Sequence, residues 1–465
     1  MRTSRIVLLV IVLLLAAGAG IYTLWPARLH CPECNVLIIG IDTLRADRLH
    51  AFGYSRETTP TLDALAANGV SFTNAISASS WTVPSFMSIM TGVYPSVHEV
   101  TNKFSVFTAT EQKFSGLSEL APDITTLAEV LKRSGYATGG FAAAPDVSAK
   151  FGYGKGFDEF VQSGLFGKMA SSSGPAFAWL DSLPKRQKFF MFFHGYDAHG
   201  YTELSQDERV FVPSGYDGLY TGSRREATAL RQEQLTQPLT LTPEDVAFWN
   251  GLYDSKIRKA DAEVAALLDE LRKRGVLDNT LVIVLSDHGE EFYEHGGTDH
   301  GLTLYDELIR VPLIINIPRG TRGLKIPAQV STMDVAPTIF DILDITPGET
   351  FSRQQQGKSL LPYFAGTADA GRDVFVETDY RDFTHKRGIR TADGWKLIVT
   401  METGTEELYN LTNDPKEATD LARKLPQKTA ELRGKLDAHL RDDLSADLSK
   451  TYTTGCLPVY KGECE

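Results

Sequence analysis

Three short apolar runs in this chain each end beside a side chain that can bind a metal or move a proton. The runs and the groups after them are VLIIGI (36–41) before Asp42, FFMFF (189–193) before His194, and LVIVL (281–285), after one serine, before Asp287 and His288. Continuous runs of this kind predict strands that are buried on both faces, as in parallel sheets. Asp and His also begin ordinary loops, but three such endings favour a shared site. Because ligands bind beyond the carboxyl ends of parallel strands, we expect these side chains to converge.

The rest of the chain predicts an α/β protein in two parts. Helical and strand patterns alternate up to about residue 345, as in a doubly wound, mostly parallel sheet with helices on both faces. The segments expected in this part are helices at 61–68, 124–133 (capped by Asp123), 253–274 and 334–343, and a further buried strand at 311–317. Beyond it, strand-like segments at 374–378, 388–391, 395–399 and 407–410 and a helix at 426–440 predict a small antiparallel sheet with one helix. We therefore expect a catalytic α/β domain at 35–345 and a C-terminal subdomain at 346–465.

Residues 201–245 interrupt this alternation. The stretch is polar, with scattered Gly and Pro and no clear periodicity. Segments of this length inside a compact domain are usually functional or mobile. The sequence leaves open whether it forms a lid over the site or a surface excursion.

The first 25 residues predict a targeting segment. Arg2 and Arg5 precede an uncharged, mostly apolar run from Ile6 to Trp25, which is long enough to cross a bilayer as a helix. The small residues at 17–19 also suit cleavage of a signal peptide. With either reading we expect the remainder at the cell envelope, outside the cytoplasm: periplasmic and held by an N-terminal membrane anchor, or secreted.

The four cysteines agree with that compartment. Cys31 and Cys34 precede the first strand, and Cys456 and Cys464 lie near the end of the chain. A pair at each end of an exported protein predicts disulfides that hold the termini. A four-thiolate zinc site and a redox-active CxxC are the alternatives.

Composition excludes some partners. The chain is 42% hydrophobic and 23% charged, which is ordinary for a globular protein, and its net charge is −12. That charge argues against a nucleic-acid-binding surface. A substrate anion would have to be bound locally, by a metal, backbone amides and a few basic side chains.

Thr82 and Pro84 predict the start of a helix. Threonine is a good capping residue and proline fits the first turn. A helix N-terminus also offers free amides and positive potential to a phosphate or sulfate group. Thr82 is therefore either only a cap or part of an oxyanion site.

Ordered motifs along most of the chain carry a family resemblance. They are GIDTLRAD (40–47), TVP (82–84), SDHGE (286–290), EHG (294–296), HG (300–301), LYDE (304–307), DVAPT (334–338) and ELYNL (407–411). In this order they resemble the sulfatase branch of the alkaline-phosphatase superfamily, over about residues 35–422. The resemblance implies an alkaline-phosphatase-like fold and a metal-dependent ester hydrolase.

The resemblance also assigns roles, with one departure. Asp42, Asp287 and His288 match the family's metal ligands, and Thr82 falls where sulfatases carry a Cys or Ser that is converted to formylglycine. That conversion needs Pro two residues on and Arg four residues on, whereas this chain has Thr82, Pro84 and Phe86. Thr82 is thus similar to the unmodified, metal-bound nucleophile of the superfamily's phosphodiesterases and phosphoryl-group transferases.

Other polar groups are matched less firmly. The resemblance implies substrate or leaving-group contacts for His194 and His199, and a place beside the transferred group for His300. His295 either contacts substrate or shapes its loop, and Asn102 and Lys103 are either oxyanion contacts or a solvated turn. Three oxygen ligands and one imidazole suit one divalent ion, Mn²⁺, Mg²⁺, Ca²⁺ or Zn²⁺. A second ion would be feasible if His194 or His199 joined His300.

The sequence therefore predicts an envelope enzyme that cleaves a small anionic ester through Thr82 and a covalent intermediate. The ester could be linked to a lipid or a glycan. Phosphoester chemistry is favoured because the formylglycine signature is absent. The alternatives are a true sulfuric ester hydrolase, a phosphoryl-group transferase acting on an envelope lipid or glycan, and a catalytically silent binding protein.

Overall fold

The computed structural model describes most of the chain between residues 29 and 442. The stretches left out within it are 102–103, 108–111, 116–118, 165–166, 203, 368–370 and 381–383. The N-terminal segment, Asn102, Lys103, Cys456 and Cys464 lie outside the described residues. Within them, Cys31 and Cys34 form a disulfide, and no helix has the length and apolar character needed to cross a membrane.

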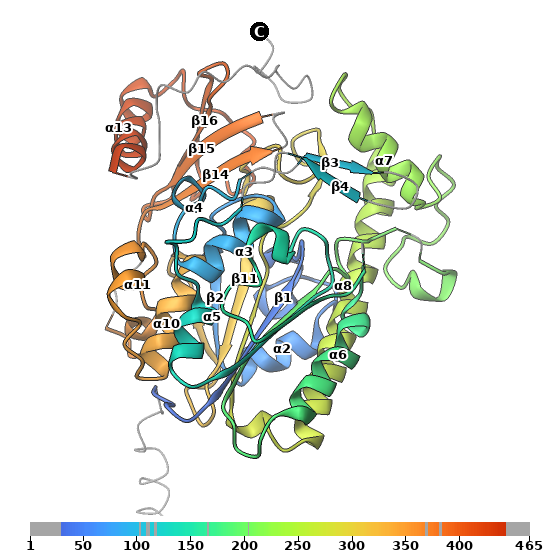
Figure 1. Ribbon diagram of the computed structural model, residues 1–465. Helices are drawn as coiled ribbons and strands as arrows, with labels where there is room; N and C mark the ends of the chain where they lie inside the picture. The colour runs from blue at the N-terminus through green and yellow to red at the C-terminus, as the bar shows by residue number, and fades with distance from the viewer. Residues whose placement is uncertain are drawn as a thin grey trace, which may run out of the picture.

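A large sheet forms the centre of the molecule (Figure 1). In the described part of the chain it has nine strands: β1 (Asn35–Ile41), β2 (Val70–Ile76), β5 (Ala137–Ala142), β6 (Glu159–Gln162), β7 (Phe189–Gly195), β8 (Thr280–Leu285), β11 (Arg310–Asn316), β12 (Leu324–Ile326) and β13 (Val330–Ser331). Their order is β12-β2-β11-β8-β1-β7-β5-β6, with β13 also beside β2. The three apolar runs are thus adjacent and parallel, since β1 pairs with β7 on one side and β8 on the other. β11 is antiparallel to β2 and β8, so the sheet is mixed but mostly parallel.

Helices cover both faces of this sheet, as predicted. The larger ones are α2 (Pro60–Ala67), α3 (Thr82–Thr91), α5 (Leu127–Arg133), α6 (Met169–Ser182), α7 (Arg224–Glu233), α8 (Pro243–Lys273) and α10 (Val335–Ile342). Short elements are α4 (Pro95–His98), α9 (Asp306–Ile309), α11 (Glu349–Gln354), α12 (Leu361–Phe364), β3 (Phe104–Phe107), β4 (Gln112–Ser115), β9 (Glu291–Phe292) and β10 (Thr298–Asp299).

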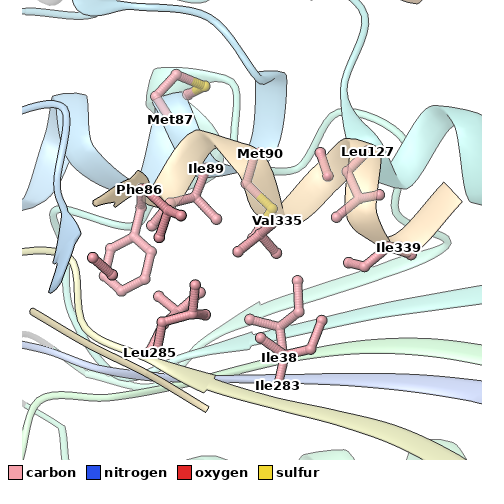
Figure 2. Packing of buried hydrophobic residues seen from close by; sticks show 14 of the residues in the cluster. Ile38, Phe86, Met87, Ile89, Met90, Leu127, Ile283, Leu285, Val335 and Ile339 are labelled. Carbon is pink, nitrogen blue, oxygen red and sulfur yellow. The ribbon is translucent and has the colours of Figure 1, made fainter. Parts of the chain in front are cut away.

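Alternating side chains of β1 supply both cores. Val36 and Ile38 pack with α3, α5 and α10, whereas Leu37 and Ile39 pack with α2, α6 and α8. Figure 2 shows the first of these cores, where α3 and α10 lie over Ile38 and the β8 side chains. The packing fixes α3 above the carboxyl end of β1.

The C-terminal sheet is antiparallel and carries one helix, as predicted. Its strands are β14 (Val374–Tyr380), β15 (Thr384–Arg390), β16 (Trp395–Thr400) and β17 (Glu406–Asn410), and the helix is α13 (Pro426–Asp442). Figure 1 shows this sheet in orange at one end of the main sheet, with α13 in red beside it. The turn between β15 and β16 contains Gly394 with φ 86°, which suits the expected hairpin. The division of the chain at residue 345 stays a prediction.

Two expected helix features were wrong, and one helix was not predicted. α5 is capped by Thr126, whose hydroxyl accepts from the Glu129 amide, and not by Asp123. α8 begins at Pro243 instead of residue 253, because Thr242 and Asp245 form a capping box ahead of the apolar stripe. The polar stretch 201–245 contains the helix α7, which a capping box at Ser223 starts. This helix has a mostly polar surface and therefore lacks the apolar periodicity that predicts a helix.

Candidate active site

Four predicted side chains meet at the carboxyl edge of the sheet. Asp42 follows β1, Asp287 and His288 follow β8, and Thr82 is the first residue of α3; each is at most 1% exposed. Ligand atoms of Asp42, Asp287 and His288 lie within 4.8 Å of one another. Thr82 Oγ1 is 3.4 Å from Asp42 Oδ2 and 3.2 Å from His288 Nε2. The structure thus brings the hydroxyl and the three candidate ligands into one group.

The hydroxyl of Thr82 does not cap its helix. Trp81 occupies the N-cap position, no side chain makes the capping bond, and Thr82 lies inside the first turn. The simple capping role is therefore wrong, and the hydroxyl faces the carboxylates instead. The buried Tyr153 holds this turn, since its hydroxyl donates to the Val83 carbonyl at 2.6 Å.

The donor set fits a divalent cation. Burial raises the pKa of the Asp287 carboxyl, and the adjacent Asp42 carboxylate raises it further. Asp287 Oδ2 accepts no hydrogen bond from the described residues, yet it lies 3.3 Å from His288 Nε2. The short contact of His288 Nδ1 with the Gly289 carbonyl, 2.7 Å, assigns the proton to Nδ1 and turns the Nε2 lone pair toward the carboxylates. A lone pair and two buried carboxylates repel one another unless a cation lies between them.

A strained turn carries the first ligand. Thr43, next to Asp42, has φ 58°, a left-handed conformation that costs energy for a β-branched residue. Its amide donates to Asp287 Oδ1 at 3.3 Å. From α8, the Tyr253 hydroxyl donates to the Thr43 carbonyl at 2.5 Å and accepts from the Arg45 amide at 3.1 Å. Tyr253 therefore bridges both sides of the turn.

We expect Tyr253→Phe to weaken metal binding about 10–100-fold, in the range seen for residues that orient ligands. The reason is that loss of the hydroxyl frees the strained turn and lets the Asp42 carboxylate move. Titration calorimetry with Mn²⁺ on the metal-free protein measures the effect. Thr43→Gly relieves the strain, so the same Tyr253 substitution should cost less in that background. Equal affinities for wild type and Tyr253→Phe would contradict the assignment.

His194 lies behind Asp42. Its Nε2 is 3.2 Å from Asp42 Oδ2, the side chain is fully buried, and burial lowers its pKa to about 4. Phe86 packs edge-on against the imidazole with ring centroids 4.9 Å apart. A Cβ on Gly40 would meet the Phe86 ring at 2.7 Å, so glycine makes room for this aromatic side chain. The arrangement favours an orienting role for a neutral His194 over the predicted contact with the leaving group or substrate.

His300 and His199 continue the site on the other side. The His300 ring centroid is 4.4 Å from that of His288 and 4.9 Å from that of His199. Burial alone would lower the pKa of His300, but Asp299 and Glu290 raise it well above its ordinary value. Burial, and then His300, lower the pKa of His199, which is therefore neutral beside a cationic His300.

His295 is not part of this group. Its Nδ1 is 2.7 Å from Glu307 Oε1, its Nε2 is 3.3 Å from the Glu417 carbonyl, and Tyr305 stacks on its ring. The imidazole thus joins its own loop to the segment after β17, which favours the loop-shaping alternative.

His295 should also contribute to stability in a pH-dependent way. Burial lowers the pKa of His295, but Glu307 outweighs burial and raises it from 6.5 to about 9. The folded protein therefore keeps a proton that the unfolded chain loses, so the contribution is full below pH 6.5 and is lost as pH rises through 9. We expect His295→Gln to lower the unfolding free energy by about 1–3 kcal/mol at low pH and by much less above pH 9. Urea unfolding of wild type and His295→Gln below pH 6.5 and above pH 9 measures this difference, and an equal loss of unfolding free energy at the two pH values would refute it.

Three site residues were missed in the sequence. Tyr253 belongs to a helix whose apolar stripe suggested only core packing. Asp299 stands beside His300 in the HG motif, which was the one local signal for it. Arg231, from the polar stretch, pairs with Asp299, and nothing near Arg231 in the sequence indicates that contact.

Comparisons with known proteins show which family the chain belongs to. The family described as Sulfatase matches residues 34–345, and the C-terminal region of N-sulphoglucosamine sulphohydrolase matches residues 293–445. A sulfatase of Formosa agariphila is 27% identical over 82% of each chain. A solved 2-O GAG sulfatase superposes with a TM-score of 0.72 at 20% identity, covering 93% of this chain and 98% of its own. For the phosphonate monoester hydrolase of Agrobacterium radiobacter the TM-score is 0.69 at 21% identity, covering 88% and 96%. The chain belongs to the sulfatase family of the alkaline-phosphatase superfamily and is an ester hydrolase of that superfamily.

Proposed function

We propose that this protein cleaves a small anionic phosphoester with Thr82 as a metal-activated nucleophile. Enzymes of the sulfatase family are metal-dependent. The observation that carries the proposal is the position of Thr82 Oγ1, 3.4 Å from Asp42 Oδ2 and 3.2 Å from His288 Nε2. We propose that Asp42, Asp287, His288 and the hydroxyl hold one divalent ion, with Mn²⁺, Mg²⁺, Ca²⁺ and Zn²⁺ as candidates.

Such an ion would lower the pKa of the hydroxyl and neutralise charge on the substrate. The hydroxyl proton passes to Asp42 Oδ2 or to water, and Thr82 Oγ1 forms a bond to phosphorus as the bond to the leaving oxygen breaks. Protonated His300 supplies the proton that the leaving oxygen needs. Amides in the first turn of α3 provide positive potential for the transferred group. Water then attacks the phosphorus of the phospho-threonine and gives one proton to His300, while Thr82 Oγ1 leaves and takes back the proton held by Asp42 Oδ2 or by water.

Sulfate esters are the second candidate class. They are supported by the family and by the likeness to a 2-O GAG sulfatase, while the likeness to a phosphonate monoester hydrolase supports phosphorus chemistry. We favour phosphoesters because Thr82 and Phe86 replace the residues required for formylglycine. A phosphoryl-group transferase would use the same residues with an alcohol in place of water. A silent binding protein would bind no stoichiometric metal.

We further propose that the enzyme acts at the cell envelope. The uncharged run from Ile6 to Trp25 supports export, with that segment either kept as an anchor or removed. An envelope location would give the site access to lipid- or glycan-linked esters. The net charge of −12 argues against nucleic-acid substrates.

A panel of nitrophenyl substrates tests the choice of ester. Purified protein loaded with Mn²⁺ is assayed on a phosphate monoester, a phosphodiester, a phosphonate and a sulfate, each with and without chelator. We expect metal-dependent turnover with a phosphorus ester giving the highest kcat/KM. Dominant sulfate turnover would reverse the preference, and metal-independent turnover would refute the mechanism.

A further inference from the structure

The polar stretch contributes a helix that is docked beside His300. α7 ends next to β10, and Gln234, just after α7, is fully buried there. Its side-chain amide donates to the Thr298 carbonyl at 2.9 Å and accepts from the Thr298 amide at 2.9 Å. These paired bonds fix the end of α7 against the strand that carries Asp299.

One carboxylate then joins α7 to the candidate catalytic histidine. Arg231 forms an ion pair through Nε with Asp299 Oδ2, and Asp299 Oδ1 is 2.9 Å from His300 Nδ1. Glu290 Oε1 contacts the same Nδ1 at 3.3 Å. Asp299 is only 4% exposed and has φ 80°, a strained conformation of the kind that is held at functional sites. Because Nδ1 is engaged, Nε2 on the opposite side of the imidazole is left for the substrate.

We propose that Arg231 is a positioning residue, which acts through Asp299 to set the orientation of His300 toward the transferred group. The inference rests on the proposed function and makes α7 a working part of the site rather than a surface excursion. Arg231 draws one oxygen of the buried carboxylate to itself and thereby fixes where the other oxygen lies. Without the guanidinium, the carboxylate can rotate toward His300 with either oxygen, and Glu290 remains as the one fixed partner of Nδ1 among the described residues.

The geometry of the Arg231–Asp299 pair differs from that of an ordinary surface ion pair. Typical ion pairs at the surface contribute little because both partners are solvated. Here the acidic partner is buried, and its second oxygen lies 2.9 Å from His300 Nδ1. By contrast, Arg225 on the same helix is exposed. Arg225 is therefore a matched control for the loss of one arginine from α7.

The experiment compares Arg231→Ala, Arg231→Lys and Arg225→Ala in the full-length, Mn²⁺-loaded protein. The readouts are kcat and KM on the best nitrophenyl ester, the affinity for inorganic phosphate, the affinity for Mn²⁺ and the melting temperature. We expect Arg231→Ala to lower kcat and weaken phosphate binding about 10-fold or more, by analogy with other residues that orient a site from behind. Arg231→Lys should restore part of the loss, while Arg225→Ala and all Mn²⁺ affinities stay unchanged.

A double-mutant cycle with Asp299→Asn tests the route of action. If Arg231 works through Asp299, Arg231→Ala should have little further effect on kcat in the Asp299→Asn background. Additive losses, or an Arg231→Ala protein that matches Arg225→Ala, would overturn the inference, as would a fall in melting temperature with kcat unchanged. If the wild-type protein cleaves no ester, the proposed function fails, but the affinity for inorganic phosphate still tests the role of Arg231. Weaker phosphate binding in Arg231→Ala alone supports the positioning role, and unchanged phosphate binding in Arg231→Ala refutes it.

Discussion

Thr82→Ala should lower kcat on the best phosphoester by about 10³-fold or more, the scale of loss seen when other catalytic nucleophiles are removed. The reason is that the alanine variant keeps the carboxylates, His288 and the α3 N-terminus but has no atom to form the covalent intermediate. Steady-state kinetics measure the effect, with Mn²⁺ content recorded in parallel.

The matched control is Thr82→Ser. Serine keeps the hydroxyl at the same position, and Phe86 still denies it the formylglycine signature. We expect Thr82→Ser to retain far more activity than Thr82→Ala. Equal activity of Thr82→Ala and wild type would remove Thr82 from the mechanism.

Asp287→Asn should abolish stoichiometric metal binding while the protein stays folded. The amide keeps an acceptor for the Thr43 N–H but removes one of the two negative charges that attract a cation. Burial next to Asp42 already raises the pKa of the Asp287 carboxyl, so the neutral amide relieves repulsion in the metal-free protein. We therefore expect an unchanged or slightly higher melting temperature without metal. Elemental analysis and circular dichroism measure the two effects.

Asp261→Asn provides the control for removal of a buried carboxylate. Asp261 is 2% exposed and accepts from the Thr61 and Leu62 amides at the start of α2. Its substitution should cost stability yet leave the metal content intact. Full metal content in Asp287→Asn, or unfolding of that variant, would contradict the ligand assignment.

The meeting of Asp42, His194 and Asp287 at one edge of the sheet was predictable from the local sequence around each of them. The runs ending at Asp42, His194 and Asp287 could be read as buried strands, and the geometry of parallel sheets then required their carboxyl ends to meet. The structure has β7, β1 and β8 side by side in that order. A strand that is buried on both faces must be apolar at nearly every position, so its carboxyl end can be located in the sequence where the apolar run stops.

The supporting contacts were not predictable in the same way. Tyr253 contacts the Thr43 turn through the hydroxyl at the end of an otherwise apolar ring. Apolar periodicity identifies the ring as part of the core but gives no sign of the hydrogen bond that the hydroxyl makes. Arg231 belongs to a helix with little apolar surface, so its contact with Asp299 depends on how α7 docks. The alternative in which Thr82 only caps its helix was wrong because helix α3 begins one residue earlier than a threonine cap requires. Propensity places a helix end only to within a residue or two.

In the proposed mechanism, a metal held by Asp42, Asp287 and His288 makes the Thr82 hydroxyl the attacking group. The most direct test is peptide mass spectrometry of enzyme quenched in acid during turnover of the best nitrophenyl phosphoester, with and without Mn²⁺. We expect one added phosphoryl group on Thr82, present only when metal is supplied. A phosphoryl group on another residue, or labelling of Thr82 that is independent of metal, would contradict it.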